Sequence, residues 1–462
     1  MATRTRLAAA LAGALLVLVT GCGGGEGGAA ADNRITVWTL ENLPDRLAAQ
    51  QALAQRFTQS TGIAVDLVGV DEDQFNQLVT SSAASGDLPD VVGALSLAGV
   101  RSLAANELLD PDTAGRVVDT LGAETFSARA LELTRDGNTQ LAVPSDGWAQ
   151  LLFYREDLLT AAGLPIPRTY ADIATAAKTL NTGGVAGFVG STAAGDAFTQ
   201  QTFEHLALAN NCELVDPAGT VTLDSPQCAA SFSFYNDLIR TASVPGAQDV
   251  DTTRATYFAG QAAMVVWSSF LLDELAGLRA DSAPSCPQCT GDSRFLVDNT
   301  GIVPAISGPD GAGPAQFGEI VSWAVLADAA TEPAGRFVEF MMADGYPDWL
   351  GFAPEGKIPA RSGTPEQPNR FTELWATLPA GVDTKAPLAE YYPPEVLQEL
   401  SGSLDTFRRW GITQGQGALV GATLGELPVP QAVAAMTSGE IDPAQAAKQA
   451  DEAVTELQNS LR

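Results

Sequence analysis

The sequence contains very little histidine, cysteine or positive charge, and each shortage excludes a class of function. His205 is the single histidine, which excludes multi-histidine metal sites and catalytic schemes that need two imidazoles. Lysine and arginine number 25 against 55 aspartates and glutamates, so the net charge is −30. A surface of that sign repels phosphate backbones and anionic headgroups, which excludes an electrostatic nucleic-acid footprint and a basic membrane patch.

Apolar residues, in contrast, are plentiful enough for a large core. The chain has 462 residues, of which 45% are hydrophobic and 17% charged, so the length predicts two or three domains. A β-branched run at 35–38, a helical pattern ended by Gly62 and an alternating run at 63–67 predict a βαβ unit with a parallel sheet. Thr169 and Asp172 resemble a capping box. Because this alternation continues along the chain, we expect two α/β lobes.

The first residues indicate export. Arg4 and Arg6 precede an apolar stretch at 7–20, which is shorter than the roughly 20 residues that span a bilayer. Gly21 followed by Cys22 resembles a bacterial lipobox, so we expect a signal peptide over 1–21 and a lipid on the Cys22 sulfur. The glycine-rich residues 22–32 would form a flexible tether. The alternative is an ordinary secretory signal.

Four further cysteines lie in the exported part: Cys212, Cys228, Cys286 and Cys289. Their even number in an oxidising compartment indicates disulfides. Proximity favours Cys212–Cys228 and Cys286–Cys289, one of three possible connectivities. A redox CxxC motif and a four-cysteine zinc site remain alternatives, although the prolines and glycine around the second pair indicate a loop. We predict no metal and no cofactor.

Several short motifs follow one another along the mature chain. They are Ser-Gly-Asp-Leu-Pro-Asp-Val-Val at 85–92, the segment 143–164, Pro-Arg-Thr-Tyr-Ala-Asp-Ile at 167–173, Phe-Ala-Gly-Gln-Ala-Ala-Met at 258–264 and Gly-Lys-Ile-Pro-Ala-Arg at 356–361. In this order they resemble the family-1 extracellular solute-binding proteins, the sugar receptors of ABC importers. The cysteine pair at 286–289 and the glycine-rich stretch 411–425 depart from the family pattern.

The resemblance implies a two-lobed periplasmic-binding-protein fold of the type II kind, each lobe a mostly parallel sheet flanked by helices, with a ligand cleft between them. The expected lobes are 33–145 with 306–358, and 146–305 with 359–462. The expected crossings between them fall near 144–147, 302–306 and 357–361.

The implied function is capture of a mono-, di- or oligosaccharide or glycoside and its delivery to the permease subunits of an ABC transporter. The protein would be a monomer on the outer face of the cytoplasmic membrane, touching the membrane only through its lipid. The alternative is a secreted, lipid-anchored enzyme acting on glycosides, which needs two carboxylates about 5–9.5 Å apart. No motif in the sequence selects such a pair, so we expect a binding protein rather than an enzyme.

The motif positions suggest which residues would contact a sugar. A tryptophan face covers the C–H side of a pyranose, while carboxylates and guanidinium groups bind hydroxyls. The expected ligand residues are Trp38, Glu41, Asp146, Trp148, Trp267, Trp323 and Arg361. Each has a structural alternative: a core position for the tryptophans, and a helix cap, hinge contact or salt bridge for the charged residues.

Overall fold

The computed structural model describes residues 33–461. The predicted signal peptide and tether, with the lipidation site at Cys22, lie outside these residues. Within 33–461, no helix combines the length and the apolar character that crossing a bilayer would require.

Strands and helices alternate along most of the described chain. The strands are β1 (Arg34–Thr39), β2 (Ala64–Gly69), β3 (Val91–Leu95), β4 (Arg135–Asp136), β5 (Thr139–Gln140), β6 (Val143–Arg155), β7 (Met264–Ser268), β8 (Thr300–Val303), β9 (Gln316–Val325), β10 (Ile358–Pro359), β11 (Pro379–Ala380), β12 (Ala386–Pro387) and β13 (Phe407–Arg408). The α-helices are α1 (Pro44–Thr61), α2 (Glu72–Ser85), α3 (Leu97–Ala105), α4 (Pro111–Leu121), α5 (Ala128–Leu133), α6 (Glu156–Ala162), α7 (Tyr170–Leu180), α8 (Ala197–Ala209), α9 (Pro226–Ala242), α10 (Val250–Phe258), α11 (Leu271–Leu275), α12 (Phe295–Asp298), α13 (Thr331–Met341), α14 (Tyr346–Leu350), α15 (Arg370–Trp375), α16 (Pro394–Ser401), α17 (Gly417–Glu426), α18 (Pro428–Ser438) and α19 (Pro443–Ser460). Short 3₁₀ turns include η1 (Ala123–Thr125), η3 (Gln288–Thr290), η4 (Pro354–Gly356) and η6 (Ser403–Thr406).

The predicted βαβ unit is confirmed. β1 pairs in parallel with both β2 and β3, and α1 connects β1 to β2. Pro44 begins α1, Leu53 and Phe57 are buried, and Gly62 ends the helix in the left-handed conformation at φ 75°. The capping box of α7 is also present, because the Thr169 hydroxyl accepts from the Asp172 amide and the Asp172 carboxylate accepts from the Thr169 amide.

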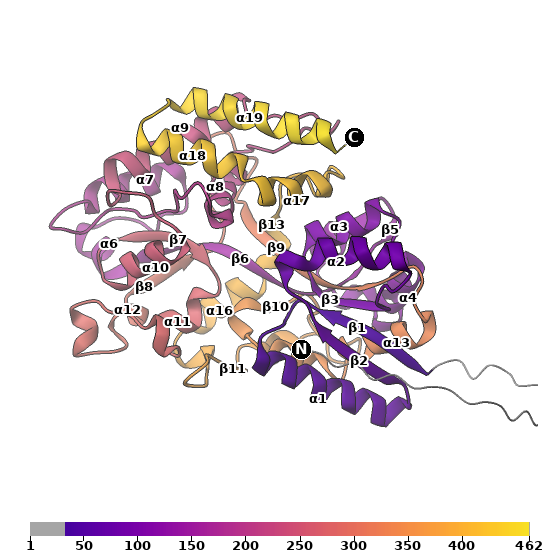
Figure 1. Cartoon of the computed structure of the whole chain (residues 1–462). Coiled ribbons are helices and arrows are strands. Elements are labelled where there is room, and N and C mark those ends of the chain that lie inside the picture. The colour runs from indigo at the N-terminus through magenta and orange to yellow at the C-terminus, as the bar shows by residue number, and fades with distance from the viewer. Residues whose placement is uncertain (1–32, 462) are drawn as a thin grey trace, which may run out of the picture. The chain divides into compact units, whose positions relative to one another are not determined.

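Most strands belong to one mixed sheet, and β4-β5 and β11-β12 form two small separate sheets. The order of the mixed sheet is β10-β6-β9-β3-β1-β2, with β7 and β8 paired to β6 and β13 paired to β9. The long strands β6 and β9 are antiparallel to each other, and β6 is antiparallel to β7 and β8. Figure 1 shows β6 running from the region of β1–β3 to the region of β7 and β8. β6 and β9 are therefore shared by both halves of the fold.

The buried apolar residues form three clusters, and the two clusters that include residues of β1 and β3 are together called the first core. The first core gathers around β1, β3, α4 and α13, and the second around β6–β8, α7–α9 and the C-terminal helices. In β6, Val143 belongs to the first core and Ala149 to the second. In β9, Trp323 belongs to the first core and Ile320 to the second. Each long strand thus changes core within six residues.

Residues 302–306, where we expected the chain to cross between the lobes for the second time, pack with the second core. Ile302 and Ile306 both pack in the second core, as does Ala315 at the start of β9. The change of core occurs later, between Ile320 and Trp323. We therefore propose to place the second crossing in β9 rather than at 302–306, because the residues after 306 bury their apolar side chains with the second lobe.

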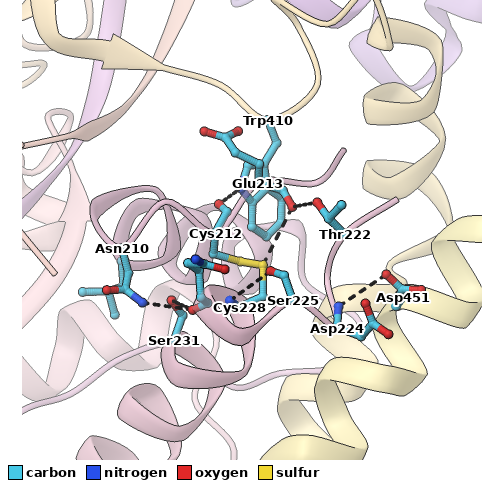
Figure 2. The surroundings of a disulfide bond; sticks show 12 residues. Asn210, Cys212, Glu213, Thr222, Asp224, Ser225, Cys228, Ser231, Trp410 and Asp451 are labelled. Atoms are coloured by element: carbon cyan, nitrogen blue, oxygen red, sulfur yellow. Dashed lines mark hydrogen bonds between the residues drawn. A yellow bond between two sulfur atoms is a disulfide. The ribbon is translucent and has the colours of Figure 1, made fainter. Parts of the chain in front are cut away.

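The structure contains two disulfides among the described residues, with the pairing that proximity favoured. Cys212, just after α8, is joined to Cys228 in the first turn of α9, and Cys286 is joined to Cys289 around η3. Figure 2 shows the Trp410 indole donating a hydrogen bond to the Cys212 carbonyl at 2.8 Å. The first disulfide therefore joins the residues after α8 to the first turn of α9, and the Cys212 carbonyl in addition binds Trp410.

Candidate functional site

A partly exposed aromatic surface lies where β6 leaves the first core. The Trp148 ring lies 5.5 Å from the Phe317 ring and 6.2 Å from the Phe270 ring, centroid to centroid. Phe317 comes from β9, and Phe270 follows the end of β7. Trp148 and Phe270 are both half-buried, whereas the other six tryptophans of the chain are buried. Of the tryptophans predicted to contact ligand, Trp148 is thus the one whose ring remains accessible.

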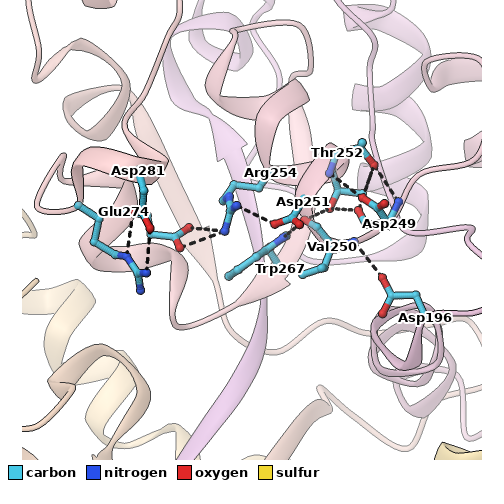
Figure 3. A network of polar contacts seen from close by, with 11 residues as sticks. Asp196, Asp249, Val250, Asp251, Thr252, Arg254, Trp267, Glu274 and Asp281 are labelled. Carbon is cyan, nitrogen blue, oxygen red and sulfur yellow. Dashed lines mark hydrogen bonds and ion pairs between the residues drawn. The ribbon is translucent and has the colours of Figure 1, made fainter. Parts of the chain in front are cut away.

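Trp267 is held by contacts within its own lobe. Its indole nitrogen donates to the Val250 carbonyl at 3.1 Å, and its ring is only 5% exposed. The Arg254 guanidinium lies 5.7 Å from the ring centroid and also binds Asp251 and Glu274. Figure 3 shows this network around the Trp267 ring. The indole N–H and much of the ring surface are therefore already in use.

Buried ionic groups surround the start of β6. The Lys357 ammonium lies 2.6 Å from a Glu41 oxygen and 3.2 Å from an Asp146 oxygen, and Arg46 binds the other Glu41 oxygen at 2.6 Å. Burial raises the pKa of Glu41, but Lys357 and Arg46 outweigh it and lower that pKa to about 2. Lys357 also lies 4.2 Å from the centroid of the Trp349 ring. This ionic cluster ties the turn after β1 to β6 and to the segment before β10.

The expected ligand role of Asp146 does not fit its position. Its side chain is 0% exposed. One carboxylate oxygen binds Lys357, and the other accepts from the Ser145 hydroxyl at 2.8 Å and the Trp349 indole at 3.3 Å. Burial raises its pKa, with Lys357 acting in the opposite direction. Asp146 is therefore a structural anchor of the ionic cluster, whereas Glu41 keeps partial exposure at its edge.

Trp323 and Arg361 also differ from expectation. Trp323 is 1% exposed and packs against the rings of Trp349 and Phe337 at 4.8 and 5.8 Å, because β9 turns this face into the first core. Arg361 is 2% exposed. Its guanidinium donates to the carbonyls of Met342 and Leu121 and to the Thr125 hydroxyl. Both are structural residues in this conformation.

Trp38 lies at the end of β1 and is 9% exposed. Its side chain packs with Val92, Leu95 and neighbouring residues of the first core. Its accessible edge is thus much smaller than that of Trp148.

A second ionic cluster was missed by the sequence reasoning. Arg409 binds Glu204 of α8 at 2.6 Å and Glu319 of β9 at 3.1 Å. The other Glu319 oxygen accepts from the Leu97 amide at the start of α3 at 2.8 Å. The Arg409 guanidinium also lies 4.4 Å from the Phe317 ring centroid. The cluster therefore connects the aromatic surface to helices on both sides of it. Because its residues are far apart in the sequence, no local sequence pattern indicates that they come together.

The buried acids nearest to an enzyme-like arrangement are Asp273 and Glu355. Burial is the main cause that raises the pKa of Asp273 to about 6 and that of Glu355 to about 8. The negative charge of Asp273 also contributes to the raised pKa of Glu355 and of its neighbour Glu274. The side chains of Asp273 and Glu355 are almost completely covered, at 1% and 4% exposure. Within 33–461, no group of three or more histidines, cysteines or carboxylates is arranged to hold a metal ion. At the aromatic surface, the half-buried rings of Trp148 and Phe270 are the accessible ones.

Comparisons with known proteins agree with this geometry. Residues 41–346 match the family model of the bacterial extracellular solute-binding proteins. The chain is 28% identical over 323 residues to YcjN of Escherichia coli, whose name describes a periplasmic-binding protein of an ABC transporter; the match covers 68% of this chain and 70% of YcjN.

Solved structures show the same fold at low identity. The maltose-bound MalE3 protein of T. maritima superposes with a TM-score of 0.65 at 19% identity, covering 92% of this chain and 99% of that one. The GacH receptor of Streptomyces glaucescens gives 0.64 at 21% identity, covering 92% and 98%. Because the family model spans most of the chain and these neighbours have the same two-lobed fold, the chain belongs to the bacterial extracellular solute-binding proteins.

Proposed function

We propose that the protein captures a neutral carbohydrate between its two lobes and delivers it to the permease of an ABC transporter. The half-exposed pair of Trp148 and Phe270 carries the proposal, since flat aromatic faces suit the C–H faces of sugar rings. Structural neighbours hold maltose, laminaribiose and α-D-tagatose, which supports the ligand class. Glu41 would bind hydroxyls beside the rings, with Trp38 at the margin.

A thermal-shift screen tests the ligand class. The panel should contain maltose, maltotetraose, laminaribiose, D-tagatose and ribitol, with amino acids and short peptides as the contrasting class. A sugar present at 100 times its Kd stabilises the folded protein by about 2.7 kcal/mol, and this raises the melting temperature. Stabilisation by a peptide or amino acid, and by none of the sugars, would contradict the proposal.

We further propose that the protein works as a monomer at the outer face of the cytoplasmic membrane, attached through a lipid on Cys22. The support is the sequence order of basic residues, apolar stretch and Gly21-Cys22. Cys22→Ser should leave the precursor uncleaved or release the protein into the medium. A processed Ser variant that stays in the membrane fraction would argue against lipid attachment.

A further inference from the structure

Gln150, in the middle of β6, carries a buried amide that the fold does not use. The side chain is 0% exposed, and neither its oxygen nor its nitrogen has a hydrogen-bond partner among residues 33–461. The strand does not require this amide, because β6 is paired through its backbone to β7 and β9. Burial of an unpaired amide is unfavourable, and an apolar side chain of the same size would avoid it. Folding stability therefore does not explain the presence of this amide, and we consider a role in ligand binding.

The position of Gln150 in β6 is consistent with such a role. Side chains two residues apart on a strand share a face, so Gln150 projects from β6 on the same face as Trp148. The register pairs Trp148 with Glu319 and Ala149 with Gly318, so Phe317 is the next residue of β9 after the paired segment. Phe317 is in turn in contact with the Trp148 ring. The unpaired amide thus adjoins the aromatic surface on the side of the second lobe.

A second unpaired group lies beside it. Ser269 precedes Phe270, is 0% exposed, and its hydroxyl has no partner. The Ser269 amide donates to the carbonyl of Ala149 at 2.8 Å, which fixes the serine next to the β6 residue between Trp148 and Gln150. The turn after β7 therefore holds a second unused neutral polar group directly before Phe270 and against the β6 backbone.

We propose that Gln150 and Ser269 form a polar subsite that binds ligand hydroxyls and sets specificity. This inference rests on the proposed carbohydrate-binding function. An amide offers a donor and an acceptor side by side, which matches a pair of sugar hydroxyls, and a serine hydroxyl adds one more of either kind. Because both groups are neutral, the subsite suits an uncharged polyol portion rather than a carboxylate or phosphate. Both are covered in this conformation, so ligand entry requires displacement of the half-buried Trp148 or Phe270 ring.

Replacement of the Gln150 amide by an apolar side chain distinguishes a role in ligand binding from a role in folding stability. In Gln150→Leu we expect titration calorimetry with maltose, and with the rest of the sugar panel, to show binding about 10- to 100-fold weaker than in the unmodified protein. The melting temperature without ligand should stay the same or rise by about 1–4 °C, since an unpaired buried group is removed. Ser269→Ala should weaken the same sugar less and leave the melting temperature unchanged.

Thr202→Val in α8 is the matched control. Thr202 is also 0% exposed, its hydroxyl has no partner within residues 33–461, and it belongs to α8 rather than to β6 or the turn after β7. This variant should keep the sugar affinity within about twofold while its melting temperature stays or rises. If Gln150→Leu does not fold, Gln150→Met, with a flexible apolar side chain of similar length, serves instead. Unchanged affinity in a folded Gln150 variant would overturn the subsite alone, whereas absence of sugar binding by the unmodified protein would overturn the proposed function.

Discussion

Trp148 and Trp323 stand on neighbouring antiparallel strands, yet their rings have opposite environments. The Trp148 ring meets two phenylalanines and keeps an accessible face. The Trp323 ring is enclosed by Trp349 and Phe337, and a Cβ on Gly93 would lie only 2.2 Å from it. The difference shows that exposure of a strand tryptophan depends on what packs over that strand at that point, here the change of core along β6 and β9.

The largest expected effect is on the buried ring. Trp323→Ala should reduce the free energy of unfolding by about 3–5 kcal/mol, because it leaves a large cavity in the first core. Sugar affinity per folded molecule should not change. Urea unfolding with parallel titration calorimetry measures both quantities. A loss of affinity with full stability would mean that Trp323 contacts ligand after all.

Acid should weaken the ionic cluster that lies between the two tryptophans. The folded pKa of Glu41, about 2, lies below its ordinary value of 4.5, so its stabilising contribution is present above about pH 4.5 and is lost as pH falls toward 2. The contribution is on the order of 3 kcal/mol. Urea midpoints at pH 7, 5, 4 and 3 should fall more steeply for the unmodified protein than for Glu41→Gln. Equal slopes would show that Glu41 is not held ionised by Lys357 and Arg46.

Replacement of Trp148 should reduce sugar affinity more than stability, which is the reverse of the result expected for Trp323. Trp148→Ala should weaken sugar binding by about 5- to 150-fold, which corresponds to about 1–3 kcal/mol for the burial of one aromatic side chain by ligand. Stability should change little, because the ring is half-exposed. Calorimetric titration and thermal melts of this variant are the measurements. Lost stability with retained affinity would place Trp148 in the same class as Trp323.

The smallest effect is expected at the partner ring. Phe270→Leu keeps an apolar side chain but removes the ring contact with Trp148, which is worth about 0.5–1.5 kcal/mol. Sugar affinity should therefore fall about 2- to 10-fold. Titration of Phe270→Leu alone, Trp148→Ala alone and the double variant shows whether the two rings act together. Strict additivity would indicate that they contact ligand independently.

Part of this organisation could be predicted from the sequence. The βαβ unit around α1, the capping box of α7 and the family resemblance depend on residues close together in the chain. The burial of Asp146 in an ion pair could not be predicted, because its partner Lys357 is 211 residues away in the sequence. The same limit applies to Trp323, because the rings that cover it come from α13 and α14, which follow it in the chain. The sequence pattern indicated residue types that suit a sugar site, but tertiary packing determines which of those side chains are accessible.

The division of β9 between the two cores has a consequence for the order in which the chain can fold. The first core contains Val37 and Val91 from the beginning of the chain together with Trp323, Trp349 and Phe371. β3 therefore lacks its antiparallel neighbour, and the helix α4 lacks α13, until synthesis has passed residue 340. A nascent chain of 300 residues cannot complete its first lobe. Folding of the amino-terminal part is therefore coupled to the arrival of β9, α13 and α14.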